Sequence, residues 1–230
     1  MPPQAILFDL DDTLLATTAA DRWRVQEVVR LAASWPGVPA AEFERRYRDV
    51  DARDRHQVDS GAVGYREYRR RRIAAASAPW HSLSARDLDC YERICDGSIV
   101  RCVPLPGAVD AVARTRRLGL ATGILTNGPS DVQRRKIAAA GLAGAVDVIV
   151  VSAERGVVKP APEIFALACA ELGVAPGGVA MVGDSLSSDV TGALAAGLGA
   201  AAWVDAGHDP PPPGAIRITG AAAALSALLS

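Results

Sequence analysis

The sequence predicts an α/β fold, in which a doubly wound parallel sheet carries a block of helices inserted after its first strand. Two observations lead to this prediction. From residue 104 onward, short apolar runs bounded by turn formers alternate with amphipathic helical patterns. This alternation is typical of a parallel sheet covered by helices on both faces. Residues 16–103, in contrast, show helical patterns only.

The first expected element is a strand over residues 4–9, because Ile6-Leu7-Phe8 is an apolar run that ends in acidic residues. Helices follow in the insert, where apolar residues recur at steps of three and four and so share one helix face. Two such faces are Val25, Val28, Val29, Ala32 and Trp35, and then Phe43, Tyr47 and Val50. A third helix is expected over residues 65–76.

A fourth helix of the insert has a clear start. Ser84 stands at the N-cap and Asp87 at the capping-box position, while Leu83 and Leu88 form a hydrophobic staple. The buried face is expected to contain Leu88, Tyr91 and Cys95. Gly97 is expected to end the helix, because glycine is common just past a helix C-terminus.

The rest of the chain alternates between the two kinds of element. Helices are expected over residues 107–118, 130–140, 161–172, 187–196 and 221–229, and strands over 120–125, 147–151, 179–182, 200–204 and 215–218. Parallel strands joined through helices require right-handed crossovers. The fold is therefore expected to be Rossmann-like, with a core domain of residues 1–15 and 104–230 and a helical cap domain of residues 16–103.

Composition narrows the function classes. Half of the residues are apolar, 22% are charged and the net charge is −1, which is ordinary for a globular protein and argues against a nucleic-acid polymer as partner. The sequence contains no apolar run of membrane-spanning length and no signal-peptide pattern at Met1-Pro2-Pro3-Gln4. We therefore expect no membrane association and a cytoplasmic location. The four cysteines lack metal-site spacing and are expected to be free thiols.

Four polar clusters follow predicted strands at the points where those strands end. They are Asp9-Leu10-Asp11-Asp12-Thr13, Thr126-Asn127-Gly128, Lys159-Pro160 and Gly183-Asp184, with Asp189 five residues later. Ligands of parallel sheets bind at the carboxyl ends of the strands. Two carboxylates about 4 Å apart repel by roughly 4 kcal/mol at an effective dielectric of 20. A divalent cation relieves that repulsion, and carboxylate oxygens suit Mg²⁺.

Lysine is rare in this chain, since only Lys136 and Lys159 occur beside 23 arginines. Lys159 precedes a predicted helix, whose N-terminus already carries positive potential. An anion nearby would explain a cation there. Asp189 falls in the first turn of another predicted helix, where it could bind a metal directly or hold Lys159 and a metal-bound water. We favour the second role.

Together the clusters resemble the four motifs of the haloacid dehalogenase-like hydrolase superfamily in order, spacing and strand placement. The helical insert resembles the subclass with a small α-helical cap. Residues 125–128 and 159–165 are similar to the N-acylneuraminate-9-phosphatase and pyrimidine 5′-nucleotidase branches. The resemblance implies an Mg²⁺-dependent phosphatase that acts on a small phosphorylated metabolite, such as a sugar phosphate, a nucleoside monophosphate or a phosphorylated acid.

The resemblance also implies roles for individual residues. Asp9 would attack phosphorus and form an aspartyl-phosphate, and Asp11 would serve as general acid and then base. Mg²⁺ would be held by Asp9, by the backbone carbonyl of Asp11 and by Asp184.

Phosphoryl oxygens would be bound by Thr126, Asn127 and Lys159, with help from backbone amides of the Asn127–Gly128 turn. The cap would select the substrate, and Trp23 and Arg24 are candidates for lining its cavity.

Three other functions share parts of this pattern. A sugar phosphomutase of the same superfamily needs the same residues and stays open. A 2-haloacid dehalogenase lacks an acid at the position of Asp11 and uses no metal. A receiver-like phosphorylated binding module is about half as long, has no helical insert and takes its phosphorylated aspartate from a later strand.

Overall fold

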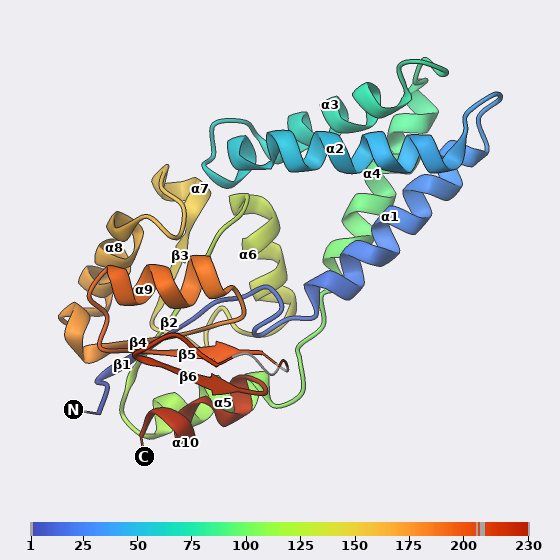
Figure 1. The fold of residues 1–230 in the computed structure, drawn as a ribbon. Coiled ribbons are helices and arrows are strands. Elements are labelled where there is room, and N and C mark those ends of the chain that lie inside the picture. Colours follow the sequence, from blue (N-terminus) through green and yellow to red (C-terminus); the bar gives the residue numbers. More distant parts are fainter. Residues whose placement is uncertain (1, 206, 208–209, 230) are drawn as a thin grey trace.

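The computed structural model describes residues 2–205, 207 and 210–229. Six strands form one parallel sheet in the order β3-β2-β1-β4-β5-β6 (Figure 1). The strands are β1 (Ala5–Phe8), β2 (Ala121–Thr126), β3 (Val148–Val151), β4 (Val179–Gly183), β5 (Ala200–Val204) and β6 (Ala215–Ile218). The predicted doubly wound parallel sheet is confirmed.

Strand order creates a natural binding position. From β1 the chain first builds outward through β2 and β3, and then returns to pair β4 with the other side of β1 before adding β5 and β6. The order therefore reverses between β1 and β4. In open α/β sheets, ligands bind in the crevice beyond the carboxyl ends of the strands at such a reversal.

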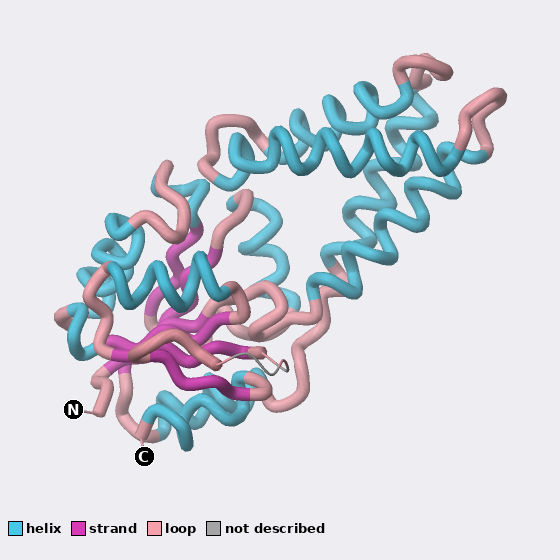
Figure 2. The backbone as a smooth tube through the Cα atoms, in the orientation of Figure 1, coloured by secondary structure: helices cyan, strands magenta, loops and turns pink. Residues whose placement is uncertain are grey.

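Helices cover both faces of the sheet (Figure 2). One face packs against α5 (Ala108–Arg117), α6 (Ser130–Ala139) and α10 (Ala224–Leu228), and the other against α8 (Pro162–Leu172) and α9 (Gly192–Ala195). The alternation of β1 shows why both faces are apolar. Ile6 and Phe8 enter the first hydrophobic cluster, whereas Ala5 and Leu7 enter the second.

Four helices stand between β1 and α5 and share a hydrophobic cluster of their own (Figure 1). They are α1 (Thr17–Ala33), α2 (Ala40–Asp59), α3 (Tyr65–Ser77) and α4 (Ala85–Ile99), and we call them the helical insert. Its expected helix faces are buried, apart from Val29 and Leu88, which are partly buried. Whether the insert is a domain with the expected limits, residues 16 and 103, stays a prediction.

The expected start of α4 is correct and the expected end is wrong. Ser84 Oγ accepts a hydrogen bond from the Asp87 amide at 3.2 Å, and the Asp87 carboxylate accepts one from the Ser84 amide at 2.9 Å. The helix continues past Gly97 to Ile99, which is buried. Gly97 instead permits close packing, because a Cβ there would lie 3.1 Å from the Trp23 ring.

The helix expected over residues 187–196 is two segments. A π-helical turn, Leu186–Thr191, comes first and α9 follows it. In this wide turn, the amides of Asp189 and Val190 both donate to the Ser185 carbonyl, at 2.9 and 3.2 Å. Such turns are frequent at functional sites, and this one buries Asp189.

All four cysteines are free, as expected, and three of them are buried. Among the described residues, no helix combines the length and the apolar character needed to cross a bilayer.

Candidate active site

The register of the central strands brings the polar clusters to one edge. Phe8 is paired with Ile124 on one side and with Val182 on the other. Asp9 follows directly, and its amide donates to the Val182 carbonyl at 2.8 Å. Thr126 and Asp184 each lie two residues beyond the partners of Phe8. Asp9 therefore stands at the point where the strand order reverses, between the two neighbouring strand ends.

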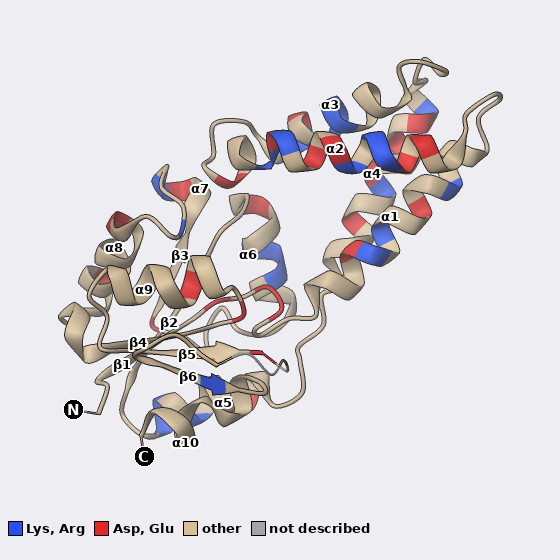
Figure 3. Ribbon diagram, in the orientation of Figure 1, with Lys and Arg blue, Asp and Glu red and all other residues tan. Residues whose placement is uncertain are grey.

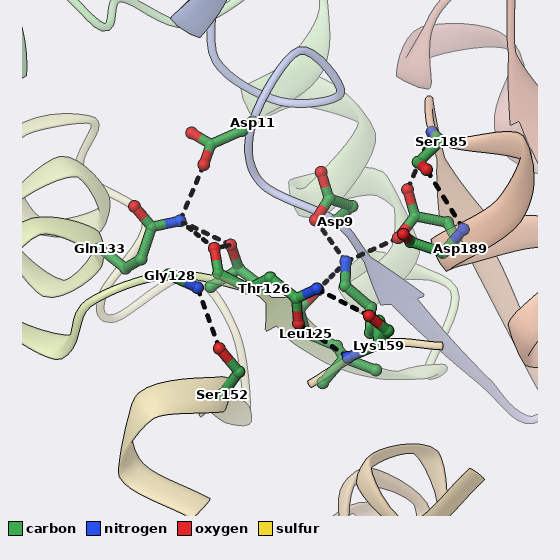
Figure 4. Close-up of polar contacts among 12 residues, drawn as sticks. Asp9, Asp11, Leu125, Thr126, Gly128, Gln133, Ser152, Lys159, Ser185 and Asp189 are labelled. Carbon is green, nitrogen blue, oxygen red and sulfur yellow. Dashed lines mark hydrogen bonds and ion pairs between the residues drawn. The ribbon is translucent and has the colours of Figure 1, made fainter. Parts of the chain in front are cut away.

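A buried ammonium group lies at the centre of the site (Figure 4). Lys159 Nζ donates to Asp9 Oδ1 at 2.5 Å, to Asp189 Oδ1 at 2.6 Å and to the Leu125 carbonyl at 2.9 Å. Only 4% of the Lys159 surface is exposed. Burial alone would lower the pKa of this ammonium, but the charges of Asp9 and Asp189 outweigh burial and raise the pKa. Lys159 is therefore a fixed positive charge beside Asp9.

The carboxylates around Lys159 are not fully neutralised by it. Burial raises the pKa of Asp9 well above its ordinary value, and Asp189 and Asp11 raise it further against the opposing effect of Lys159. Burial, followed by the charges of Asp189 and Asp12, raises the pKa of Asp184 to about 6. This excess of negative charge is what a cation site requires.

The donor set fits Mg²⁺. Carboxylate oxygens of Asp9, Asp184 and Asp189 all lie within 4.8 Å of one another. Oxygen ligands at about 2.1 Å from one Mg²⁺ are at most about 4.2 Å apart, so small side-chain rotations bring such oxygens to bonding distance. Hard oxygen donors and mutual repulsion both favour a divalent cation here.

Asp189 differs from Asp9 and Asp184 because both of its carboxylate oxygens accept hydrogen bonds from the protein. Its Oδ1 accepts from Lys159, and its Oδ2 accepts from the Ser185 amide at 3.0 Å. Gly183 makes room for it, because a Cβ at that position would lie 2.4 Å from atoms of Asp189. The close approach explains why glycine ends β4.

Asp11 lies in a different set of contacts. Figure 4 shows its side chain directed to Gln133, which donates to Asp11 Oδ2 at 2.9 Å. Lys136 and Thr17 donate to Asp11 Oδ1 at 2.8 and 2.5 Å. Burial would raise the pKa of Asp11, but the charge of Lys136 and these hydrogen bonds together lower it. Asp11 is thereby held as a carboxylate.

Sequence reasoning missed Gln133 and Lys136. Both lie on α6 and are buried, with Gln133 also donating to Thr126 Oγ1 at 2.6 Å. The available signal was the rarity of lysine, which drew attention to Lys159 and could equally have drawn it to Lys136.

The turn after β2 differs from the expectation. The Asn127 side chain brackets the backbone of Lys159, accepting from its amide at 2.8 Å and donating to its carbonyl at 3.0 Å. The Gly128 amide, expected to point to a phosphoryl oxygen, donates to Ser152 Oγ at 2.9 Å. Ser152 begins α7 (Ser152–Arg155), a short helix that the sequence did not predict, and its hydroxyl also donates to the Asp59 carbonyl of α2. The loop is therefore held by a contact from outside its motif.

Comparisons with known proteins indicate the family of the chain. The family model for haloacid dehalogenase-like hydrolases matches residues 3–197. A phosphoserine phosphatase of Thermus thermophilus is 46% identical over 108 residues, which are 47% of this chain and 43% of that protein. Human N-acylneuraminate-9-phosphatase is 31% identical over 212 residues, covering 88% of this chain and 82% of that protein.

Solved structures agree as well. A HAD phosphatase from Thermococcus onnurineus superimposes with a TM-score of 0.74 at 26% identity, covering 97% of this chain and 96% of that one. The expected similarity to the N-acylneuraminate-9-phosphatase and pyrimidine 5′-nucleotidase branches is confirmed, because proteins of both names are among the relatives. The chain belongs to the haloacid dehalogenase-like hydrolase family.

Proposed function

We propose that this hydrolase cleaves a small phosphomonoester through an aspartyl-phosphate on Asp9, with Mg²⁺ as cofactor. The observation that carries the proposal is the buried group in which Lys159 bridges Asp9 and Asp189, with Asp184 beside them. Several relatives are named as phosphatases, which supports the same reaction class.

Asp9 has one oxygen held by Lys159, and its other oxygen is the one we assign to attack phosphorus. A carboxylate nucleophile divides the displacement into formation and hydrolysis of an acyl phosphate. Lys159 places positive charge where the equatorial phosphoryl oxygens gather negative charge, and Thr126 adds a hydroxyl. When bound, Mg²⁺ would supply further charge stabilisation, held by Asp9, Asp184 and the Asp11 backbone carbonyl.

Asp189 is proposed to position Lys159, because both of its oxygens already accept hydrogen bonds from the protein. The same contacts make it a poorer metal ligand than Asp9 or Asp184.

Asp11 is proposed as the general acid and base. Its carboxylate form suits removal of a proton from the water that hydrolyses the acyl phosphate. Protonation of the leaving alkoxide requires the carboxyl group to turn from Lys136 toward the substrate, because the ion pair favours loss of its proton. Lys136 therefore controls how readily Asp11 acts as an acid.

The substrates we propose are small phosphorylated metabolites, and sugar phosphates, nucleoside monophosphates and phosphorylated acids stay open. A sugar phosphomutase would pass the phosphoryl group to a sugar instead of water. Product analysis separates the two, since only hydrolysis releases free phosphate. The cytoplasmic location stays a prediction.

The proposal is tested with Asp9→Asn, using p-nitrophenyl phosphate with Mg²⁺ and measuring free phosphate. The variant keeps the shape of the side chain and loses the nucleophile, so turnover should fall by about a thousand-fold or more. Asp131→Asn, an exposed carboxylate in the first turn of α6, is the matched control and should retain the wild-type rate. Appreciable turnover by Asp9→Asn would remove the nucleophile assignment.

Metal dependence is tested separately. A chelator should stop the wild-type enzyme and added Mg²⁺ should restore it. Full phosphatase activity after chelation would remove Mg²⁺ from the proposal.

A further inference from the structure

A cavity of about 330 Å³ lies in the helical insert, between α1, α2 and α3. This volume is within the usual range for small-molecule sites, roughly 300–1,000 Å³. Its wall is unusually rich in charge, since it includes Arg22, Arg24, Arg48 and Arg72. Asp21 and Asp51 also line it. The cavity is therefore suited to a polar molecule.

The cavity adjoins the loop after β1 that carries Asp9, Asp11 and Asp12. Thr18 forms part of its wall and donates to the Asp12 carboxylate through its amide at 2.8 Å and its hydroxyl at 2.6 Å. A narrower space of about 30 Å³ shares Asp21 and Arg24 with the cavity and is lined by Gln133 and Lys136, the residues that bind Asp11. One wall thus runs from the side chains that bind Asp11 into the insert.

Arg24 lines both spaces, and one of its donor atoms has no hydrogen-bond partner among the described residues. It is only 7% exposed, and its Nη1 pairs with Asp21 at 3.2 Å. Its buried Nε has no hydrogen-bond partner among the described residues. A buried donor without an acceptor is costly, so an anion that reaches it would be bound favourably. Trp23, the other candidate from the sequence, packs against Arg101 at 3.7 Å and is absent from both walls.

The ion pairs in the cavity wall indicate which charge a bound anion should carry. Arg48 pairs with Glu44 at 2.8 Å, and Arg72 pairs with Asp51 at 2.8 Å. With Arg24 paired to Asp21, the guanidinium of Arg22 is left without an ion pair in the part of the chain that the structure describes. One unpaired positive charge matches a monoanion better than a dianionic second phosphate. A planar guanidinium also fits a carboxylate.

We propose that the substrate is a phosphomonoester whose alcohol part carries a carboxylate, and that Arg24, with Arg22, binds this carboxylate in the insert cavity. The inference rests on the proposed phosphatase function, because it assumes that the phosphoryl group is held at Asp9. Arg24 is then a specificity residue and takes no part in bond breaking.

The test uses matched substrates that differ only in the carboxylate. Suitable pairs are phosphoglycolate with ethyl phosphate, phosphoserine with phosphoethanolamine, and 6-phosphogluconate with glucitol 6-phosphate. For at least one pair, the wild-type enzyme should have a kcat/KM about ten-fold or more higher for the carboxylated member. Arg24→Gln should bring this ratio close to one, Arg24→Lys should keep part of it, and Arg22→Gln should reduce it.

The ratio of two kcat/KM values is independent of the folded fraction, so a loss of stability in Arg24→Gln does not confuse the result. Arg30→Gln, an exposed arginine on the same helix, is the control and should keep both rates. A wild-type enzyme that hydrolyses p-nitrophenyl phosphate without preference in any pair would overturn the inference and leave the phosphatase intact. So would a preference that survives Arg24→Gln. Failure to hydrolyse any ester would overturn the proposed function itself.

Discussion

Asp51 in the helical insert and the carboxylates Asp9 and Asp184 at the end of the sheet differ in how their surroundings shift their pKa values. In the insert, burial would raise the pKa of Asp51, but Arg72 and Tyr68 outweigh it and lower the pKa. At the sheet edge, burial and neighbouring carboxylates raise the pKa of Asp9 and Asp184. Figure 3 shows positive and negative residues interleaved over α1–α4.

The comparison shows that carboxylates have two different roles in this protein. In the insert, Asp51 is matched by a nearby cation and a donor, so its ionisation stabilises the fold. Asp59, near the end of α2, is an exception, because burial raises its pKa despite the charge of Arg55. At the sheet edge, Lys159 faces two carboxylates and Asp184 adds a third. This unmatched charge opposes folding and favours a bound cation, as expected where function conflicts with stability.

The strongest test of the contrast removes the cation that bridges Asp9 and Asp189 at the sheet edge. Lys159→Met should lower phosphatase turnover by about a hundred-fold or more, because charge stabilisation of the phosphoryl group is lost. It should also destabilise the protein by about 3 kcal/mol at neutral pH, since the buried carboxylates of Asp9 and Asp189 would lose the positive charge that they share. Steady-state kinetics and urea unfolding measure the two effects. Wild-type values for both would make Lys159 an incidental neighbour.

Asp184→Asn should make the protein more stable when no metal is bound. The folded-state pKa of Asp184, about 6, is above its unfolded value, so the carboxylate destabilises the protein increasingly as the pH rises from about 4 to 6 and fully above that range. In a chelator at pH 7, the variant should therefore unfold at a temperature about 2–4 °C higher than the wild type.

The same variant should respond less to metal. Mg²⁺ should raise the midpoint of the wild type, because it binds the folded state only, and should have a smaller effect on Asp184→Asn. Scanning calorimetry with and without Mg²⁺ measures both. A variant that is less stable than the wild type without metal would contradict the assigned excess of negative charge.

Asp51→Asn should make the protein less stable at neutral pH. Its carboxylate has a lowered pKa in the folded state, so its contribution is present above the unfolded pKa, about 4, and is lost as the pH falls through the folded value. We expect the free energy of unfolding to fall by about 1–2 kcal/mol at pH 7, and the difference from the wild type to shrink below pH 4. Urea unfolding at a series of pH values measures this difference. Asp49→Asn, a more exposed carboxylate on the same helix, is the control and should change little. A pH-independent difference would show that charge is not the cause.

The smallest effect concerns a purely local feature of the insert. Ser84→Ala removes one half of the capping box at the start of α4 and should cost about 1 kcal/mol. Thermal unfolding measures it, with Ser82→Ala, the same change in the preceding loop, as the comparison. Phosphatase kinetics should not change, and an altered kcat would mean that α4 is coupled to the site.

The features that could be predicted from sequence are those set by short stretches of chain. Strand ends, the amphipathic faces of the insert and the start of α4 follow from local patterns, and Asp9 and Asp184 follow from strand ends. The contact of Lys136 with Asp11 joins residues 125 positions apart, and no local pattern indicates which side chain of α6 faces the loop. Gly97 and the π-helical turn depend on Trp23 and on burial of Asp189, which are also tertiary effects.

Gly183 illustrates how little space separates these charged groups. A methyl group at this position would displace Asp189, which orients Lys159, which in turn contacts Asp9. Even alanine, the mildest replacement, would therefore disturb the reacting carboxylate through two intermediate side chains. A residue with no chemistry of its own thus limits which sequences can support the reaction, and libraries that vary the strand ends should leave it untouched.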